Sequence, residues 1–117
     1  MNIIKKNLEF NYEIIYTKDY LDELANIYYY ISIVLREQNI AEKLLTKIRK
    51  QVLGLSYFPK ANKVVYSKRN EAVHRLIVKK YAIFYKIDEL KKQIFILHIF
   101  NTRQNYLNSI FKNPYDY

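Results

Sequence analysis

Few side chains in this sequence of 117 residues could carry acid–base or metal chemistry. It contains no cysteine, which excludes disulfides, thiolate metal sites and a cysteine nucleophile. Its two imidazoles, His74 and His98, do not have the spacing typical of metal ligands. We therefore expect neither a metal nor a cofactor, and His98 is the candidate for moving a proton.

His98 stands inside the apolar run Ile94–Phe100. Side chains alternate along a strand, so we expect His98 to share a face with Ile96 and Phe100. A single histidine in an apolar strand is more often a hydrogen-bonded structural residue than a catalyst, and both roles stay open at this point.

Positive charge is concentrated in the second half of the chain. Residues 1–57 hold eight basic and seven acidic side chains, a net of +1, whereas residues 58–117 hold twelve and four, a net of +8. This asymmetry predicts an anionic partner, either nucleic acid or an acidic protein; a solvated lysine-rich face is the plainer alternative. The cations expected to contact that partner are Arg69, Arg75, Lys79, Lys80 and Arg103.

The elements that must position these residues begin with a strand and two helices. Alternation over Phe10–Tyr16 predicts a strand, and Thr17 can cap the helix that follows. The apolar stripe of that helix comprises Leu21, Leu24, Tyr28, Ile31 and Leu35. Asn39 and Glu42 have the spacing of a capping box for a second helix, which Pro59 must stop. The apolar stripe of the second helix comprises Ala41, Leu44 or Leu45, Ile48, Val52 and Leu55.

Strand-like runs dominate the remainder. A short edge strand is expected around Val64–Tyr66, and residues 89–92 are short enough for a hairpin turn. The three longer strands are expected at Ala72–Lys79, Tyr81–Asp88 and Gln93–Asn101. Residues 106–111 have the pattern of one helical turn.

The order β-α-α-β-β-β predicts an α+β fold, in which a two-helix hairpin packs on one face of a small antiparallel sheet. The length fits a single domain over residues 1–117. The side chains expected to be buried together are Leu24, Ile31, Ile48, Val52, Leu76, Val78, Ile83, Tyr85, Leu97 and Ile99.

Targeting and membrane signals are not expected in this sequence. The start, Met1–Tyr16, lacks the apolar segment of a signal peptide. The longest apolar stretch, Ile94–Phe100, is far shorter than the ~20 residues that span a bilayer. We expect a cytoplasmic protein.

Several motifs, in order over most of the chain, resemble one known superfamily. The motifs are Tyr29-Tyr30-Ile31, Phe58-Pro59, His74-Arg75-Leu76-Ile77-Val78, Tyr81-Ala82-Ile83-Phe84-Tyr85 and Asn101-Thr102-Arg103-Gln104-Asn105. Taken together they resemble the RelE/ParE superfamily of toxins from type II toxin–antitoxin systems, nearer the ParE type. The resemblance implies a sheet with the first strand beside the last, and a toxin that halts bacterial growth.

Two activities exist in that superfamily: ParE-type members poison DNA gyrase, and RelE-type members cleave mRNA on the ribosome. Arg75 matches one basic position of the cleaving relatives, and Arg103 matches the closing turn. Where those relatives often carry two further cations and a histidine, this chain has Ile77, Ala82 and Asn101. The candidates for nuclease chemistry are therefore only Arg75, Arg103 and His98.

A toxin that blocks gyrase by binding it is the favoured interpretation, because the long helical hairpin, roughly Thr17–Tyr57, resembles the ParE type. A ribosome-dependent mRNA endonuclease is the alternative. A non-toxic nucleic-acid-binding module is a third, but the sequence has no recognition helix or zinc spacing.

The resemblance also implies a partner. We expect an acidic antitoxin that is partly disordered alone and folds on binding, laying a helix across the hairpin. Toxin and antitoxin would then form a hetero-oligomer. An apolar groove together with the cationic sheet region would suit such a peptide.

Overall fold

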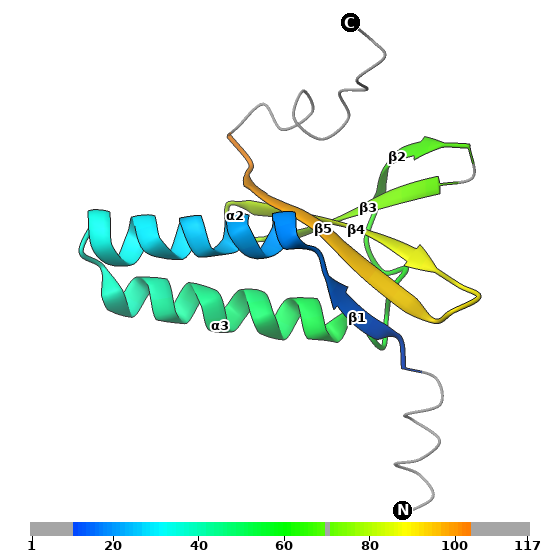
Figure 1. Cartoon of the computed structure of the whole chain (residues 1–117), viewed down its shortest axis with the longest axis horizontal. Coiled ribbons are helices and arrows are strands. Elements are labelled where there is room, and N and C mark those ends of the chain that lie inside the picture. The colour runs from blue at the N-terminus through cyan, green and yellow to red at the C-terminus, as the bar shows by residue number, and fades with distance from the viewer. Residues whose placement is uncertain (1–10, 70, 104–117) are drawn as a thin grey trace, which may run out of the picture.

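The computed structural model describes residues 11–69 and 71–103. Along the chain these form β1 (Glu13–Tyr16), α2 (Lys18–Tyr29), the π-helical segment η1 (Tyr30–Val34), α3 (Gln38–Gly54), β2 (Val64–Lys68), β3 (Glu71–Val78), β4 (Tyr81–Asp88) and β5 (Gln93–Asn101). The strands form one sheet in the order β1-β5-β4-β3-β2, and the two helices lie side by side as a hairpin (Figure 1). The predicted α+β fold is confirmed, with β1 beside β5 as the resemblance implies.

One strand pair departs from the antiparallel pattern. Strands β2 to β5 pair antiparallel in sequence order, whereas β1 runs parallel to β5, with Ile14 opposite Ile94. A parallel pair requires a long connection between its strands. The helical hairpin and three strands supply it, so the sheet is mixed.

The start of α2 follows the sequence prediction, and the start of α3 does not. Thr17 is extended (φ −76°, ψ 158°), and its Oγ1 accepts a hydrogen bond from the Tyr20 N–H at 3.3 Å. The capping box at Asn39 is wrong, because α3 begins one residue earlier, at Gln38. The Glu42 carboxylate does not cap the helix; it accepts hydrogen bonds from the Tyr28 hydroxyl and from Gln38.

The buried face of the first helix also differs from the predicted stripe. Leu21 and Leu35 are each 49% exposed, whereas Tyr20 is buried. The residues that face the core recur at the same three- and four-residue spacing: Tyr20, Leu24, Ile27 and Ile31. Leu24 and Ile31 belong to the predicted stripe, whereas Tyr20 and Ile27 take the places expected for their neighbours Leu21 and Tyr28. Periodicity alone could not choose between adjacent Tyr20 and Leu21, and the larger ring is the one that is buried. At the other end the helix widens, because the Leu35 N–H bonds to Tyr30 O, five residues back.

The core lies between the hairpin and one face of the sheet. Its helical side chains are Tyr20, Ile48, Val52 and Leu55, and its strand side chains are Leu76, Val78, Tyr81, Ile83, Tyr85, Ile94, Ile96 and Ile99. Leu24 is half-buried against this cluster, and Ile31 is buried. Most of the predicted core is therefore confirmed, and the exception is Leu97.

A β-bulge in β5 explains that exception. Tyr85 pairs with Ile96 and Phe84 pairs with His98, so Leu97 is an extra residue without an opposite partner in β4. An extra residue reverses the alternation beyond it. Leu97 is consequently only half-buried, and the prediction that His98 shares a face with Ile96 is also wrong.

Some predictions lie outside the described residues, including the start of the first strand at Phe10 and the helical turn at 106–111. The edge strand around Val64–Tyr66 is confirmed by β2, and the turn at residues 89–92 joins β4 to β5. Within 11–69 and 71–103, every helix is too short or too polar to span a bilayer.

Candidate functional site

The sheet face turned away from α2 and α3, here called the open face, has no helix on it within the described ranges. Across it, Arg75 of β3 lies opposite Phe84 of β4, which lies opposite His98 of β5. Phe84 is fully buried, and His98 stacks on Phe100 with ring centroids 5.3 Å apart. Along this row one cation and one imidazole therefore share the open face, with aromatic rings between and beside them.

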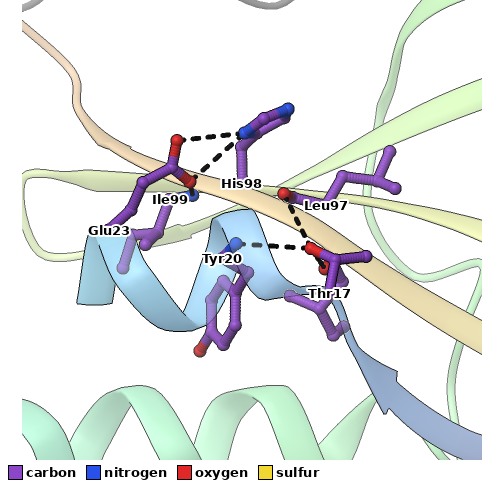
Figure 2. A network of polar contacts seen from close by, with 7 residues as sticks. Thr17, Tyr20, Glu23, Leu97, His98 and Ile99 are labelled. Carbon is purple, nitrogen blue, oxygen red and sulfur yellow. Dashed lines mark hydrogen bonds and ion pairs between the residues drawn. The ribbon is translucent and has the colours of Figure 1, made fainter. Parts of the chain in front are cut away.

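His98 is held by a carboxylate from the first helix (Figure 2). Its Nδ1 lies 3.2 Å and 3.1 Å from the two carboxylate oxygens of Glu23. The same carboxylate accepts the Ile99 N–H at 3.1 Å. A carboxylate on one ring nitrogen orients the imidazole and selects its tautomer, so Nε2 is the nitrogen left for other chemistry.

The location of Glu23 follows from the short β1 strand. β1 pairs with β5 only as far as Ile96, and α2 begins directly afterwards. At that junction the Thr17 Oγ1 lies 2.7 Å from Ile96 O and 3.1 Å from Leu97 O (Figure 2). The hydroxyl can therefore donate a hydrogen bond to the carbonyl oxygens at the bulge while it also caps α2. Helix α2 thus takes over from β1 along the β5 edge, where the backbone groups would otherwise lack partners.

One hydrogen-bond donor of the Arg75 side chain lacks an acceptor among the described residues. The Arg75 backbone N–H donates to Lys63 O at 2.9 Å, but its side-chain Nε is buried and has no hydrogen-bond partner among the described residues. An unpaired buried donor costs about 1–3 kcal/mol unless an acceptor reaches it. A carboxylate or phosphate on the open face would meet this need.

The remaining predicted cations are divided between the two ends of the sheet. Lys79 and Lys80 form the exposed turn between β3 and β4, and Arg103 follows β5. The Thr102 N–H donates to Lys80 O at 2.8 Å, which joins these segments. Arg69 lies in the β2–β3 turn, at the opposite end of β3. Four of the five cations thus extend from the centre of the sheet to one end, and Arg69 stands apart.

Uncharged residues occupy the positions where the cleaving relatives often carry cations or a histidine. Ile77 lies opposite Ala82, and Ile77 is 46% exposed, so this row of the open face is apolar. The Asn101 Oδ1 accepts the Arg103 N–H at 2.9 Å and shapes the closing turn. Lys86, which sequence reasoning did not single out, lies on the open face two residues from Phe84 and 3.9 Å from Glu71.

The other histidine is structural. His74 is buried, its Nδ1 lies 2.9 Å from Asn62 O, and its ring stacks on Tyr85 at 5.1 Å. The described residues contain no group of three or more His, Cys, Asp or Glu side chains that could hold a metal. The missed residues, Glu23 and Lys86, carry no local sequence signal, because their roles depend on the register of distant strands.

A helical hairpin on a five-stranded sheet, with its first strand beside its last, is the architecture that the resemblance to the RelE/ParE superfamily implies. The family model for the ParE toxin of the type II toxin–antitoxin system parDE matches residues 14–106. The chain belongs to this family of toxins.

Solved structures share the fold. The RelBE2 toxin–antitoxin complex of Mycobacterium tuberculosis matches at a TM-score of 0.58 and 15% identity, covering 78% of this chain and 91% of that one. The chromosomal ParDE toxin–antitoxin system of P. aeruginosa matches at 0.60 and 20% identity, covering 79% and 97%. None of the curated protein sequences matches this chain.

Proposed function

We propose that this toxin inhibits growth by binding and blocking DNA gyrase in the cytoplasm, without chemistry of its own. The observation that carries the proposal is Arg75, whose buried Nε has no partner among the described residues and whose row neighbour on the open face is Phe84. Such a group can bind an acidic side chain or a DNA phosphate through a charge-assisted hydrogen bond. Lys79, Lys80 and Arg103 extend the positive charge toward one end of the sheet.

RNA cleavage makes different demands. The 2′-hydroxyl route needs a group that orients or deprotonates the hydroxyl, cations on the scissile phosphate and help for the leaving oxygen. Ile77 and Ala82 can supply neither charge nor a proton, and Asn101 cannot titrate. Uncharged side chains at these three positions favour a toxin that blocks its target over one that cleaves RNA.

The test is a gyrase supercoiling assay with purified toxin. We expect lost supercoiling and trapped gyrase–DNA breaks, weakened in Arg75→Ala and unchanged in Lys50→Ala, which removes an exposed cation of α3. Normal supercoiling at toxin concentrations that arrest growth would contradict the proposal.

The second candidate function is a ribosome-dependent mRNA endonuclease. It is favoured by the His98–Glu23 pair, because an imidazole oriented by a carboxylate is a common arrangement for proton transfer. The test adds purified toxin to translating ribosomes and maps the mRNA by primer extension. Discrete codon-spaced cuts that vanish in His98→Asn would support the nuclease and contradict the gyrase proposal. Silence in both assays would indicate an inactive member of the family.

An acidic antitoxin is the proposed partner, in a toxin–antitoxin hetero-oligomer. The similar folds are found in toxin–antitoxin complexes, and the net charge of +9 suits an acidic protein. Co-expression with the neighbouring gene product, followed by pull-down, tests this. Abundant expression of the free protein in a growing host would count against toxicity.

A further inference from the structure

The last turns of the first helix, at the end of the hairpin that extends beyond the sheet, are apolar on two opposite sides (Figure 1). One side packs toward the core, where Ile31 is buried. On the other side Tyr29 is 58% exposed and Ile33 is 55% exposed. Residues 24–35 include no charged side chain. A helix that is apolar all round is normally buried all round, so the outer side is suited to a partner.

The exposed residues on this outer side form a row with the same pattern in both directions. Ala25, Tyr29 and Ile33 follow one another at about one helical turn, and all three are exposed. Asp22 and Arg36, also exposed, lie equally far before and after Tyr29. These five residues are here called the outer stripe.

Such a symmetric row is complementary to itself when two helices pack antiparallel around a two-fold axis beside Tyr29. The small Ala25 of one copy then lies opposite the larger Ile33 of the other, so that the two surfaces can interdigitate. Asp22 of one copy lies opposite Arg36 of the other. An apolar centre and an ion pair at each end would therefore recur by symmetry.

The distribution of charge favours a second copy at this surface. The chain carries a net charge of +9, so two copies repel each other except where little of that charge lies. Helix α2 holds three acidic residues and one basic residue, a net of −2. In the antiparallel arrangement the acidic start of each α2 lies beside Arg36 of the other copy, and the two helix dipoles oppose each other. The exposed ion pair with Lys18 uses Oδ2 of Asp22 and leaves Oδ1 for a second cation.

Other occupants complement the outer stripe less well. An acidic peptide or an anionic lipid surface would meet the carboxylates at the start of α2, and like charges disfavour binding. We infer that the outer stripe binds a second copy of this chain, as an antiparallel pair of first helices related by a two-fold axis. The inference goes beyond the proposed function, because no residue of the open face assigned to the target takes part.

The first experiment measures self-association of the purified toxin by analytical ultracentrifugation over a wide range of protein concentration. Ile33→Glu is matched by Leu53→Glu, since both residues are helical and 55% exposed, but Leu53 lies on α3, outside the outer stripe. The wild type should form a dimer as concentration rises. Ile33→Glu should weaken the dimer about tenfold or more, and Leu53→Glu should stay within about twofold of the wild type. Circular dichroism checks that both variants fold.

The second experiment reverses the two charges at the ends of the outer stripe. Asp22→Arg and Arg36→Asp, made singly, should each weaken the dimer about tenfold, because like charges then face each other. The double variant should recover the affinity of the wild type to within about twofold. Aspartate tolerates the left-handed backbone of residue 36 (φ 56°), so the fold is spared.

The third experiment locates the axis by cross-linking. The sequence contains no cysteine, so Tyr29→Cys introduces a single thiol. A disulfide requires the two Cα atoms to approach within about 7 Å, as residues beside a two-fold axis do. Mild oxidation should therefore link Tyr29→Cys into a covalent dimer. Tyr57→Cys, which replaces an equally exposed ring outside the outer stripe, should stay a monomer.

Several results would overturn the inference. A toxin that stays monomeric at every concentration would do so, as would equal losses in Ile33→Glu and Leu53→Glu. A double charge reversal no better than the single ones would exclude the antiparallel arrangement. If Ile33→Glu stopped binding of a co-expressed antitoxin or of anionic vesicles and had no effect on self-association, the outer stripe would belong to that other partner.

Discussion

The Nδ1 atom of His98 lies 3.1 Å from the nearer carboxylate oxygen of Glu23, across 75 residues of sequence. The same carboxylate accepts the Ile99 N–H, so one side chain binds both the imidazole and the backbone of β5. Each group is about a quarter exposed. The contact therefore fastens α2 to the strand edge that β1 leaves free, whatever chemistry His98 also performs.

Glu23→Ala should lower the free energy of unfolding by about 1–3 kcal/mol, because it leaves the Ile99 N–H without its acceptor. Glu23→Gln should cost less, since an amide oxygen can still accept that bond. Urea denaturation measures both. Asp22→Ala, which removes only the exposed pair with Lys18, is the control and should cost little. Equal stability of the Glu23 and Asp22 alanine variants would mean that the fastening is unimportant.

Because of the bulge, Leu76 and Leu97 should contribute unequally to stability. Leu76 lies in the core, and Leu76→Ala should cost about 2–5 kcal/mol. Leu97→Ala should cost on the order of 1 kcal/mol, because Leu97 is half-buried and outside the core. Urea denaturation compares the two variants: if the denaturant dependence of the unfolding free energy is unchanged, the shift in midpoint reports the loss of stability. A Leu97 variant as unstable as the Leu76 variant would place Leu97 in the core and argue against the bulge.

Stability should fall at alkaline pH. Burial raises the pKa of Tyr20, Tyr81 and Tyr85, so the folded state keeps phenol protons that the unfolded state releases. Their contribution is complete below the unfolded pKa of about 10 and declines as pH rises above it toward the folded values. The decline in the urea midpoint should become shallower in Tyr20→Phe and stay unchanged in Tyr57→Phe, which alters an exposed ring. The same slope in both variants would refute this assignment.

The two mechanisms differ in their response to substitutions on the open face. If the toxin blocks gyrase, Arg75→Ala should weaken inhibition about tenfold, because a charged contact is lost, and His98→Asn should have no effect. The Asn side chain can still donate to Glu23, so folding is spared. If it cleaves mRNA, His98→Asn should slow cleavage about 10²–10⁴-fold. Dose–response curves in the supercoiling assay and rates from primer extension separate these outcomes.

Local pattern determined much of this protein. Alternation and helical spacing located the strands and helices, Thr17 predicted the start of α2, and the motifs around Arg75 and Tyr81 predicted the family. Each of these signals lies within a few neighbouring residues, where steric preference and side-chain period act directly.

The tertiary structure decided the rest. The bulge at Leu97 placed Ile96 in the core, away from His98 and Phe100, which remain on the open face. The parallel β1 strand ended early enough for Glu23 to reach His98. The same register divided the predicted cations, with Arg75, Lys79, Lys80 and Arg103 toward one end and Arg69 at the other. These features depend on pairing between segments far apart in the chain, and no local preference encodes a register shift of one residue, although such a shift changes which face a side chain occupies.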